Sequence, residues 1–445
     1  MNLNTSYRQI LSISVPIMLG SAAQNIIVLS DNVFLYHLNK VEFAAVGLVG
    51  VFYLIIASIG YGFSRGGQIL IARRYGEADY NGAGDFFKAL LFFEFVMALL
   101  MFFFLQYGTP WFFAQFVDNP VIYEKCLEYI YPRSYGVFFS YLGVSLIAFY
   151  TGIARTNFIV IDTLILAVVN LVLNYILIFG KFGFEPMGIA GAGLASTIAE
   201  VVAFVVFVVY MLFDKKNRMH NLTSFKGINI KLIAQTWDIS APLIWLSMLG
   251  LGSWFIFFSL IENLGSRELE VSNLLRNVYL ILSIPCWGYS AGINTIVSNF
   301  IGNRKRQAVI PIIKKTAYLN VLTTLVLSTP IILFPEFFLY PLFGGEDMSM
   351  IKEAKELMPL LLAILATFAV GSTYMNGLMG TGHTKTGLWI QSIYTVIYVV
   401  YTALVVKYFN ANLHVAWFAE IIYWSGILLT VFWYLHTYKW HVKRF

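Results

Sequence analysis

Twelve long apolar stretches restrict this chain to very few folds. A helix needs about 20 apolar residues to cross the hydrocarbon core of a bilayer, and each stretch is close to that length. Hydrophobic residues make up 59% of the chain and charged residues only 12%, so water could not solvate its surface all round. A soluble enzyme, a nucleic-acid-binding domain and a disordered protein are therefore excluded. The predicted spans are 9–36, 43–65, 87–107, 134–152, 158–180, 188–213, 236–263, 270–298, 315–338, 356–377, 385–407 and 413–436.

The distribution of Lys and Arg predicts how these spans are oriented. Twelve spans place both termini on one side of the membrane. Of the 29 Lys and Arg residues, nineteen lie on that side and eight on the other. The positive-inside rule assigns the richer side to the cytoplasm. We therefore expect a multi-pass protein of the plasma membrane, in a bacterium the inner membrane, with both termini cytoplasmic. The net charge of +6 then follows from topology and implies no nucleic-acid partner.

The sequence repeats itself at an offset of 226 residues. The segment "ISVPIMLGS" at 13–21 falls on "ISAPLIWLS" at 239–247, and "GFSRG" at 62–66 falls on "GYSAG" at 288–292. Each repeat holds six spans, and an even number returns the chain to its starting side. The two halves should therefore share one orientation, related by an axis along the membrane normal, with the substrate path between them.

The predicted fold is an all-α integral membrane protein of twelve transmembrane helices in two pseudo-symmetric six-helix bundles. We divide the chain into an N-terminal lobe (1–213), a cytoplasmic linker (214–235) and a C-terminal lobe (236–445). The paired glycines of the 62–66 and 288–292 segments have the spacing of close helix packing, with a hinge as the alternative.

Five segments resemble the multidrug and toxic compound extrusion (MATE) family, and the resemblance covers nearly the whole chain. They are "PIMLGSAAQNIIVLSDNVFL" in the first span, "GGQILIARRYGEAD" after the second, "VVNLVLNYILIFG" in the fifth, "MGIAGAGLASTIAE" opening the sixth and "GLMGTGHTKTG" after the tenth. The resemblance implies two six-helix lobes around a central cavity. It also implies a secondary active efflux transporter, not an enzyme, that exports amphiphilic or cationic organic compounds by antiport with H⁺ or Na⁺. We expect a monomer in contact with lipid, with no nucleic acid and no cofactor beyond the coupling ion.

The candidate coupling site lies in the N-terminal lobe. Asp31 is the deepest acid of the first span, where the resemblance implies a cation-coupling carboxylate. Asn170 and Asn174 lie four residues apart and share one helical face, as do Ser196 and Glu200. Their oxygens suit a hard cation such as Na⁺, and hydrogen bonding between helices is the alternative for the Asn pair. We expect no other metal site.

This chain departs from the family pattern at two of these positions. Members often carry Asp where Asn174 stands and Gln where Glu200 stands. The amide at 174 weakens an electrostatic Na⁺ cage, and two nearby carboxylates would repel each other, so proton coupling is favoured over Na⁺ coupling. The seventh and tenth spans carry no acid in mid-helix, which places the chain closer to the branch whose coupling acid lies in the N-terminal lobe.

Three further polar groups lie within predicted spans. Glu94, Arg276 and Glu420 are expected either to line a cavity or to be structural. Two alternative functions stay open: a lipid-linked oligosaccharide flippase of the same superfamily and, less favoured, an integral-membrane transferase. A flippase would need several membrane-embedded positive charges for a diphosphate, and only Arg65 and Arg276 are assigned to the spans and not to the loops and span ends.

Overall fold

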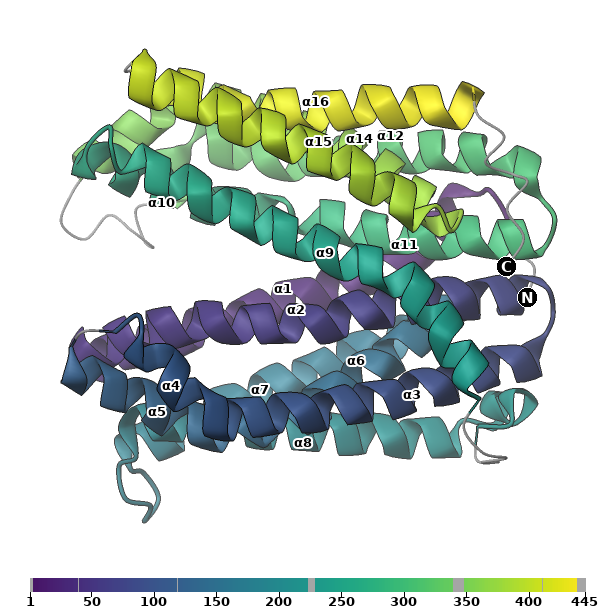
Figure 1. Ribbon diagram of the computed structural model, residues 1–445, viewed down its shortest axis with the longest axis horizontal. Helices are drawn as coiled ribbons and strands as arrows, with labels where there is room; N and C mark the ends of the chain where they lie inside the picture. Colours follow the sequence, from purple (N-terminus) through teal and green to yellow (C-terminus); the bar gives the residue numbers. More distant parts are fainter. Residues whose placement is uncertain are drawn as a thin grey trace. The chain divides into compact units, whose positions relative to one another are not determined.

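The protein is helical throughout the part of the chain that this computed structural model describes, which confirms the all-α prediction (Figure 1). The described residues are 3–38, 40–117, 119–222, 229–338, 348–409 and 411–437.

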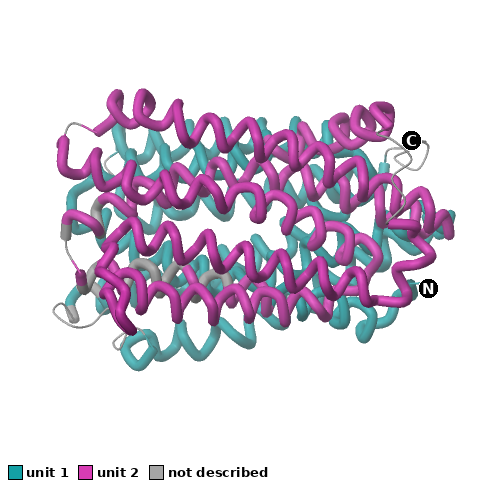
Figure 2. The backbone as a smooth tube through the Cα atoms, turned by 90° about the horizontal axis from the view of Figure 1, so that it is seen from below, with its two compact units in different colours: residues 1–18, 245–445 teal, residues 19–244 magenta. Residues whose placement is uncertain are grey.

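Two compact units make up the molecule, and Figure 2 colours them separately. Unit 1 combines Met1–Met18 with Trp245–Phe445, and unit 2 is Leu19–Ile244. The chain changes unit after Met18 and again after Ile244, two positions separated by the repeat offset of 226 residues. The predicted division of the sequence into two lobes joined by a linker at 214–235 concerns the repeats, not these units, and stays a prediction.

Unit 2 contains most of the first repeat. Its helices are α2 (Lys40–Gly76), α3 (Tyr80–Phe103), η1 (Phe104–Gly108), α4 (Thr109–Ala114), α5 (Pro120–Ser134), α6 (Gly136–Gly152), α7 (Asn157–Phe179), α8 (Gly188–Phe213) and η2 (Lys215–His220). Unit 1 contains most of the second repeat. Its helices are α10 (Ser266–Leu282), α11 (Ile284–Gly302), η3 (Arg306–Ala308), α12 (Val309–Leu333), α14 (Met348–Gly380), α15 (Thr384–Ala403), η4 (Leu404–Tyr408) and α16 (Leu413–Thr437). The first helix of each repeat, α1 (Tyr7–Leu38) or α9 (Ile230–Ile261), contributes residues to both units.

The helices have the number and length that twelve membrane spans require. Among the described residues, nine helices are long and apolar enough to span singly, and two bent helix pairs raise the number to eleven. Helix α1, 32 residues long, accounts for the remaining predicted span. One boundary differs from prediction: the fourth span begins at Pro120, because α5 and α6 form one pair bent by 51°.

The paired glycines allow helices to approach closely within each unit. A Cβ atom added at Gly66 would lie 2.8 Å from the Cβ of Ser240, and one added at Gly62 would lie 2.9 Å from the Cα of Ile244. In unit 1, Gly288 and Gly292 meet the corresponding part of α1, around Ser14 and Met18. Side chains at these four positions would force the helices apart, which supports the predicted packing role.

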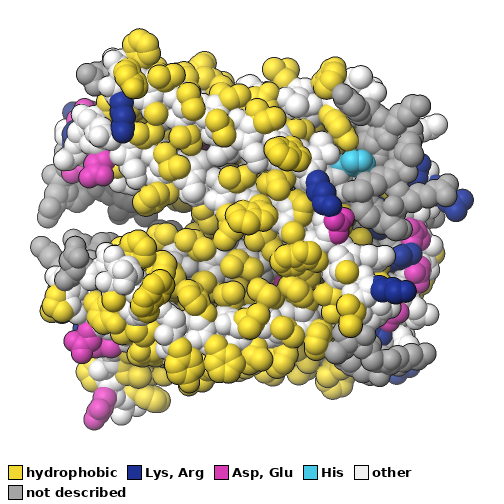
Figure 3. Space-filling view, viewed as in Figure 1, with side chains coloured by type: hydrophobic (Ala, Val, Ile, Leu, Met, Phe, Trp, Pro, Cys, Tyr) yellow, Lys and Arg dark blue, Asp and Glu magenta, His cyan; other side chains and the backbone are white. Residues whose placement is uncertain are grey.

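The distribution of apolar and charged side chains on the surface also fits a membrane protein. On the face drawn in Figure 3, apolar side chains cover the long middle part, and most charged side chains gather near the two ends. Leu212, Val168, Val326 and Phe432 are among the exposed apolar residues of the described chain. Such a band is expected where helices face hydrocarbon.

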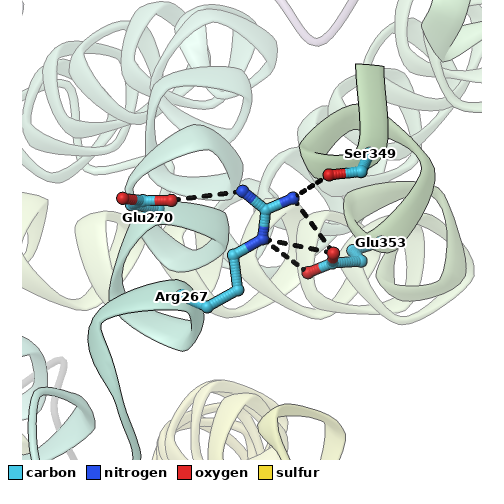
Figure 4. Close-up of polar contacts among 4 residues, drawn as sticks. All are labelled: Arg267, Glu270, Ser349 and Glu353. Carbon is cyan, nitrogen blue, oxygen red and sulfur yellow. Dashed lines mark hydrogen bonds and ion pairs between the residues drawn. The ribbon is translucent and has the colours of Figure 1, made fainter. Parts of the chain in front are cut away.

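An ionic cluster joins the beginnings of α10 and α14 in unit 1 (Figure 4). Arg267 donates hydrogen bonds to both carboxylate oxygens of Glu353, at 3.0–3.2 Å, and to Glu270 and Ser349. The charged side chains of this cluster are 33% to 59% exposed, so the cluster fixes geometry more than it adds stability.

Candidate functional site

A chain of buried polar side chains links α7 to α8 inside unit 2. Asn174 donates a hydrogen bond from Nδ2 to Oδ1 of Asn170, at 3.0 Å, and Asn170 donates from Nδ2 to Oγ of Ser196, at 3.0 Å. All three residues are buried within apolar helices. The structure therefore brings together three of the predicted site residues, and their amide and hydroxyl oxygens lie within one turn of each helix.

Glu200 lies one turn further along α8, and its carboxylate is held by an arginine. Arg133, near the end of α5, donates through both terminal nitrogens to the two carboxylate oxygens of Glu200. The arginine and glutamate side chains are only 8% and 15% exposed. The guanidinium also stacks over the Tyr53 ring, 4.0 Å from its centroid. Glu200 is thus charge-balanced within the protein and does not form hydrogen bonds with Asn170 or Asn174 in the described structure.

The backbone around the ion pair is adapted to it. Gly136 opens α6 directly after the bend, and a Cβ there would lie 2.6 Å from Glu200 and 2.9 Å from Thr197. Thr197 donates a hydrogen bond to the carbonyl of Pro132, at 2.9 Å. The bend between α5 and α6 therefore lets Arg133 reach α8 while the chain passes close to it.

Asp31 lies in helix α1, but its side chain is outside the described residues. Its proposed role at the Asn170–Asn174–Ser196 cluster stays a prediction.

The other predicted polar residues have separate environments. Glu94 on α3 accepts a hydrogen bond from Ser64 of α2, at 2.8 Å. Glu420 on α16 accepts from the indole of Trp254, at 2.9 Å, and from the phenol of Tyr398, at 3.0 Å.

Arg276 on α10 stacks over the Phe258 ring of α9, 4.9 Å from its centroid. No ion pair of Arg276 with an acid is found among the described residues.

Sequence reasoning missed two buried charged residues. Arg133 falls just before the predicted fourth span, which begins at residue 134, whereas the structure places it on helix α5 (Pro120–Ser134). Asp162 lies on α7 and is buried, and its Oδ1 has no hydrogen-bond partner in the part of the chain that the structure describes. An acid inside the predicted span 158–180 was the available signal. Among the described residues, no group of three or more His, Cys, Asp or Glu could hold a metal ion.

Comparisons with known proteins agree with the repeat and the fold. The MatE family model matches twice, over residues 16–176 and 242–404. The chain is 24% identical over 443 residues to a "Probable multidrug resistance protein NorM" of Thermotoga maritima, an alignment covering 96% of this chain and 92% of the relative. A "Multidrug resistance protein NorM" of Photobacterium profundum is 28% identical over 226 residues, 48% of this chain and 47% of the relative.

Solved structures show the same fold at low sequence identity. One is described as the outward-facing conformation of a multidrug resistance MATE family transporter of the MOP superfamily. It superposes with a TM-score of 0.88 at 18% identity, covering 96% of this chain and 95% of the other. A second, a MOP superfamily transporter from Pyrococcus furiosus, gives a TM-score of 0.83 at 19% identity, covering 97% of each chain.

Proposed function

This chain belongs to the MatE family, and on that premise we propose that it is an ion-coupled efflux transporter for amphiphilic or cationic organic compounds. Its relatives carry the name multidrug resistance protein. The family is one of transporters, and we assign no enzymatic activity to this member. A multi-pass protein of this kind belongs in a membrane. We propose the bacterial inner membrane, both termini in the cytoplasm, and a monomer as the working unit.

The observation that carries the coupling proposal is the buried cluster of Asn170, Asn174 and Ser196. Polar groups at membrane depth are costly, and aligned amide and hydroxyl oxygens give a cation ligands that hydrocarbon cannot. We propose that Asp31 supplies the single negative charge of this site. Ion binding then favours one conformation and substrate binding the other, because a ligand shifts an equilibrium only by its differential affinity.

The Arg133–Glu200 ion pair bears on which ion is used. Since Arg133 neutralises Glu200, the proposed site retains one carboxylate and three neutral side chains. A single proton discharges such a site completely, whereas a Na⁺ ion would have to compete with the side-chain amides that donate hydrogen bonds to the Asn170 and Ser196 oxygens. We therefore propose H⁺ as the coupling ion, and we give Glu200 the role of counter-ion to Arg133 beside the site.

Transport by purified protein in proteoliposomes tests this function. A fluorescent amphiphilic cation is loaded, and pH and Na⁺ gradients are imposed separately. We expect export under the pH gradient, loss of gradient-driven export in Asp31→Asn, and retained counterflow in that variant. ATP-dependent transport without any ion gradient would overturn the function. Wild-type export rates in Asp31→Asn under both gradients would remove Asp31 from the coupling role.

A further inference from the structure

One carboxyl group in unit 2 has half of its hydrogen-bonding capacity unused. Glu94 lies in the middle of α3 with no exposed surface. Its Oε1 accepts the Ser64 hydroxyl hydrogen at 2.8 Å, whereas its Oε2 is buried and has no hydrogen-bond partner among the described residues. Leaving an ionised carboxylate oxygen unpaired in an apolar interior costs several kcal/mol, and such a group neutralises itself instead.

The neighbours of Glu94 offer no counter-charge. From α2 it meets Ser64, and from α6 the titratable side chain that interacts with it is that of Tyr141. Tyr141 donates its hydroxyl hydrogen to the backbone carbonyl of Ile56, at 2.6 Å, so that hydrogen is already used. No charged side chain of the described residues acts on Glu94. The cheapest neutral form is therefore a protonated carboxyl, with the proton on Oε2.

The second repeat shows that helix packing does not require an acid at the position of Glu94. At the 226-residue offset, Glu94 corresponds to Asn320 of α12, and Ser64 to Ser290. Asn320 donates from Nδ2 to the carbonyl of Ala369, at 2.9 Å, and to Thr373, at 3.0 Å, while its Oδ1 accepts from Thr324. The same position in unit 1 is thus filled by a neutral side chain that cross-links α12 to α14. Unit 2 instead carries the ionisable side chain of Glu94, whose Oε2 accepts no hydrogen bond from the described residues.

We infer that Glu94 is a proton-binding site of unit 2, separate from the proposed Asp31 site. It is protonated in this conformation and releases its proton to water when α2, α3 and α6 separate enough to hydrate Oε2. Sodium does not fit, because hard cations take about six oxygen ligands, and among the described residues the Ser64 hydroxyl is the one side-chain group that bonds to this carboxyl. That Glu94 binds a proton is inferred from geometry alone. That this proton takes part in the transport cycle rests on the proposed ion-coupled transport.

Infrared difference spectroscopy of the purified protein detects the bound proton without any transport. A protonated carboxyl has its own carbonyl-stretch band. We expect the wild type to show one such band that Glu94→Gln lacks, and expect Ser64→Ala to shift the same band, because Ser64 bonds to that carboxyl. The matched control is Asn320→Ala, which removes the corresponding side chain of unit 1 and should leave the band in place. A Glu94→Gln spectrum identical to that of the wild type overturns the inference.

Transport then tests the use of the proton. Glu94→Gln preserves an acceptor for Ser64 and should fold. We expect it to export with a weaker dependence on the pH gradient, whereas Asp31→Asn loses gradient-driven export altogether. An unchanged pH dependence in Glu94→Gln contradicts a role for this proton in coupling. If the wild type fails to export under any gradient, the proposed function fails, and the infrared band still decides whether Glu94 binds a proton.

Discussion

The two units share one helical plan but differ in what they place at corresponding positions. In unit 2, the α5–α6 junction carries Arg133 and Gly136, which meet Glu200 of α8. At the 226-residue offset these positions in unit 1 are Pro359, Leu362 and Gly426. There Gly426 faces the ring of Tyr394, whose hydroxyl lies 2.8 Å from Thr430. The position that forms an ionic contact with α5 in unit 2 is thus a glycine that packs on a tyrosine of α15 in unit 1.

The helix bends are also exchanged between the units. Unit 2 bends by 51° between α5 and α6, whereas the corresponding α14 is continuous. Unit 1 bends by 44° between α10 and α11, whereas the corresponding α2 is continuous. Pro285 at the start of α11 corresponds to Ile59 of α2, and its missing N–H explains the second bend. The two units therefore share the same order of helices but bend at different helix pairs.

Glu420 shows how unit 1 holds its own buried acid. Trp254 and Tyr398 donate hydrogen bonds to one of its oxygens, and the surrounding rings of Phe257 and Trp417 pack 5.3 Å apart. Tyr398 also packs on Tyr423, with ring centroids at 5.7 Å. Neutral donors replace the guanidinium of unit 2, so we expect the two acids to respond differently to the same substitution.

The largest expected effect comes from separating the ion pair of unit 2. Glu200→Gln leaves Arg133 charged and uncompensated, which should lower the free energy of unfolding by about 3 kcal/mol. Arg133→Met combined with Glu200→Leu removes both charges and should recover most of that loss. The measurement is denaturant unfolding in detergent, read as a double-mutant cycle.

The matched control for this prediction is Glu420→Gln in unit 1. It keeps an oxygen acceptor for Trp254 and Tyr398 and should cost about 1 kcal/mol. Equal losses in Glu200→Gln and Glu420→Gln would break the proposed contrast between an ionic and a neutral environment.

An intermediate effect is expected where η2 packs on α3 within unit 2, a contact centred on His220. This buried imidazole bonds to the carbonyl of Tyr80 at 3.2 Å and packs against the rings of Tyr75 and Phe149. Burial lowers the pKa of His220, and the nearby Arg155 adds to this, while the Tyr80 carbonyl and Asp214 act in the opposite direction. The docked segment therefore favours the neutral ring.

Acidification should loosen this contact. Above about pH 6.5 the ring is neutral in the docked and the released segment, so the full stability is present. As the pH falls below that value, the released segment binds the proton first, and stability is lost down to the lower pKa of the docked ring. We expect faster amide hydrogen exchange of 215–222 at about pH 5.5 than at about pH 7.5, after correction for the intrinsic exchange rate. His220→Gln should reduce this difference, and an unaltered difference would contradict it.

The smallest effect is expected at the ionic contacts where α2 and α10 begin. Arg267 binds Glu353 in unit 1, and Lys125 lies 3.8 Å from Glu42 in unit 2. Because these contacts are partly exposed, Arg267→Met and Lys125→Met should each change the free energy of unfolding by less than about 1 kcal/mol. The Arg267 effect should be the larger, because its guanidinium bonds to several partners at once. Thermal unfolding at low and high salt would measure both, and a larger effect of Lys125→Met would reverse the comparison.

The sequence by itself determined the helical class, the twelve spans and the repeat. The length of an apolar stretch is a local property, and the repeat is found by comparing the sequence with itself, so neither needs the tertiary structure. It also predicted that Asn170 and Asn174 share one helical face, since residues four apart do so, but their contact with Ser196 of another helix came only from the tertiary structure. Only the tertiary structure decided the partner of Glu200 and the neighbours of Glu94. Both depend on which helices contact each other and on the bend between α5 and α6, and the hydropathy of a span predicts neither of these. The passage of the chain between units after Met18 and Ile244 was equally hidden, because an apolar helix reads the same whichever neighbour it packs against.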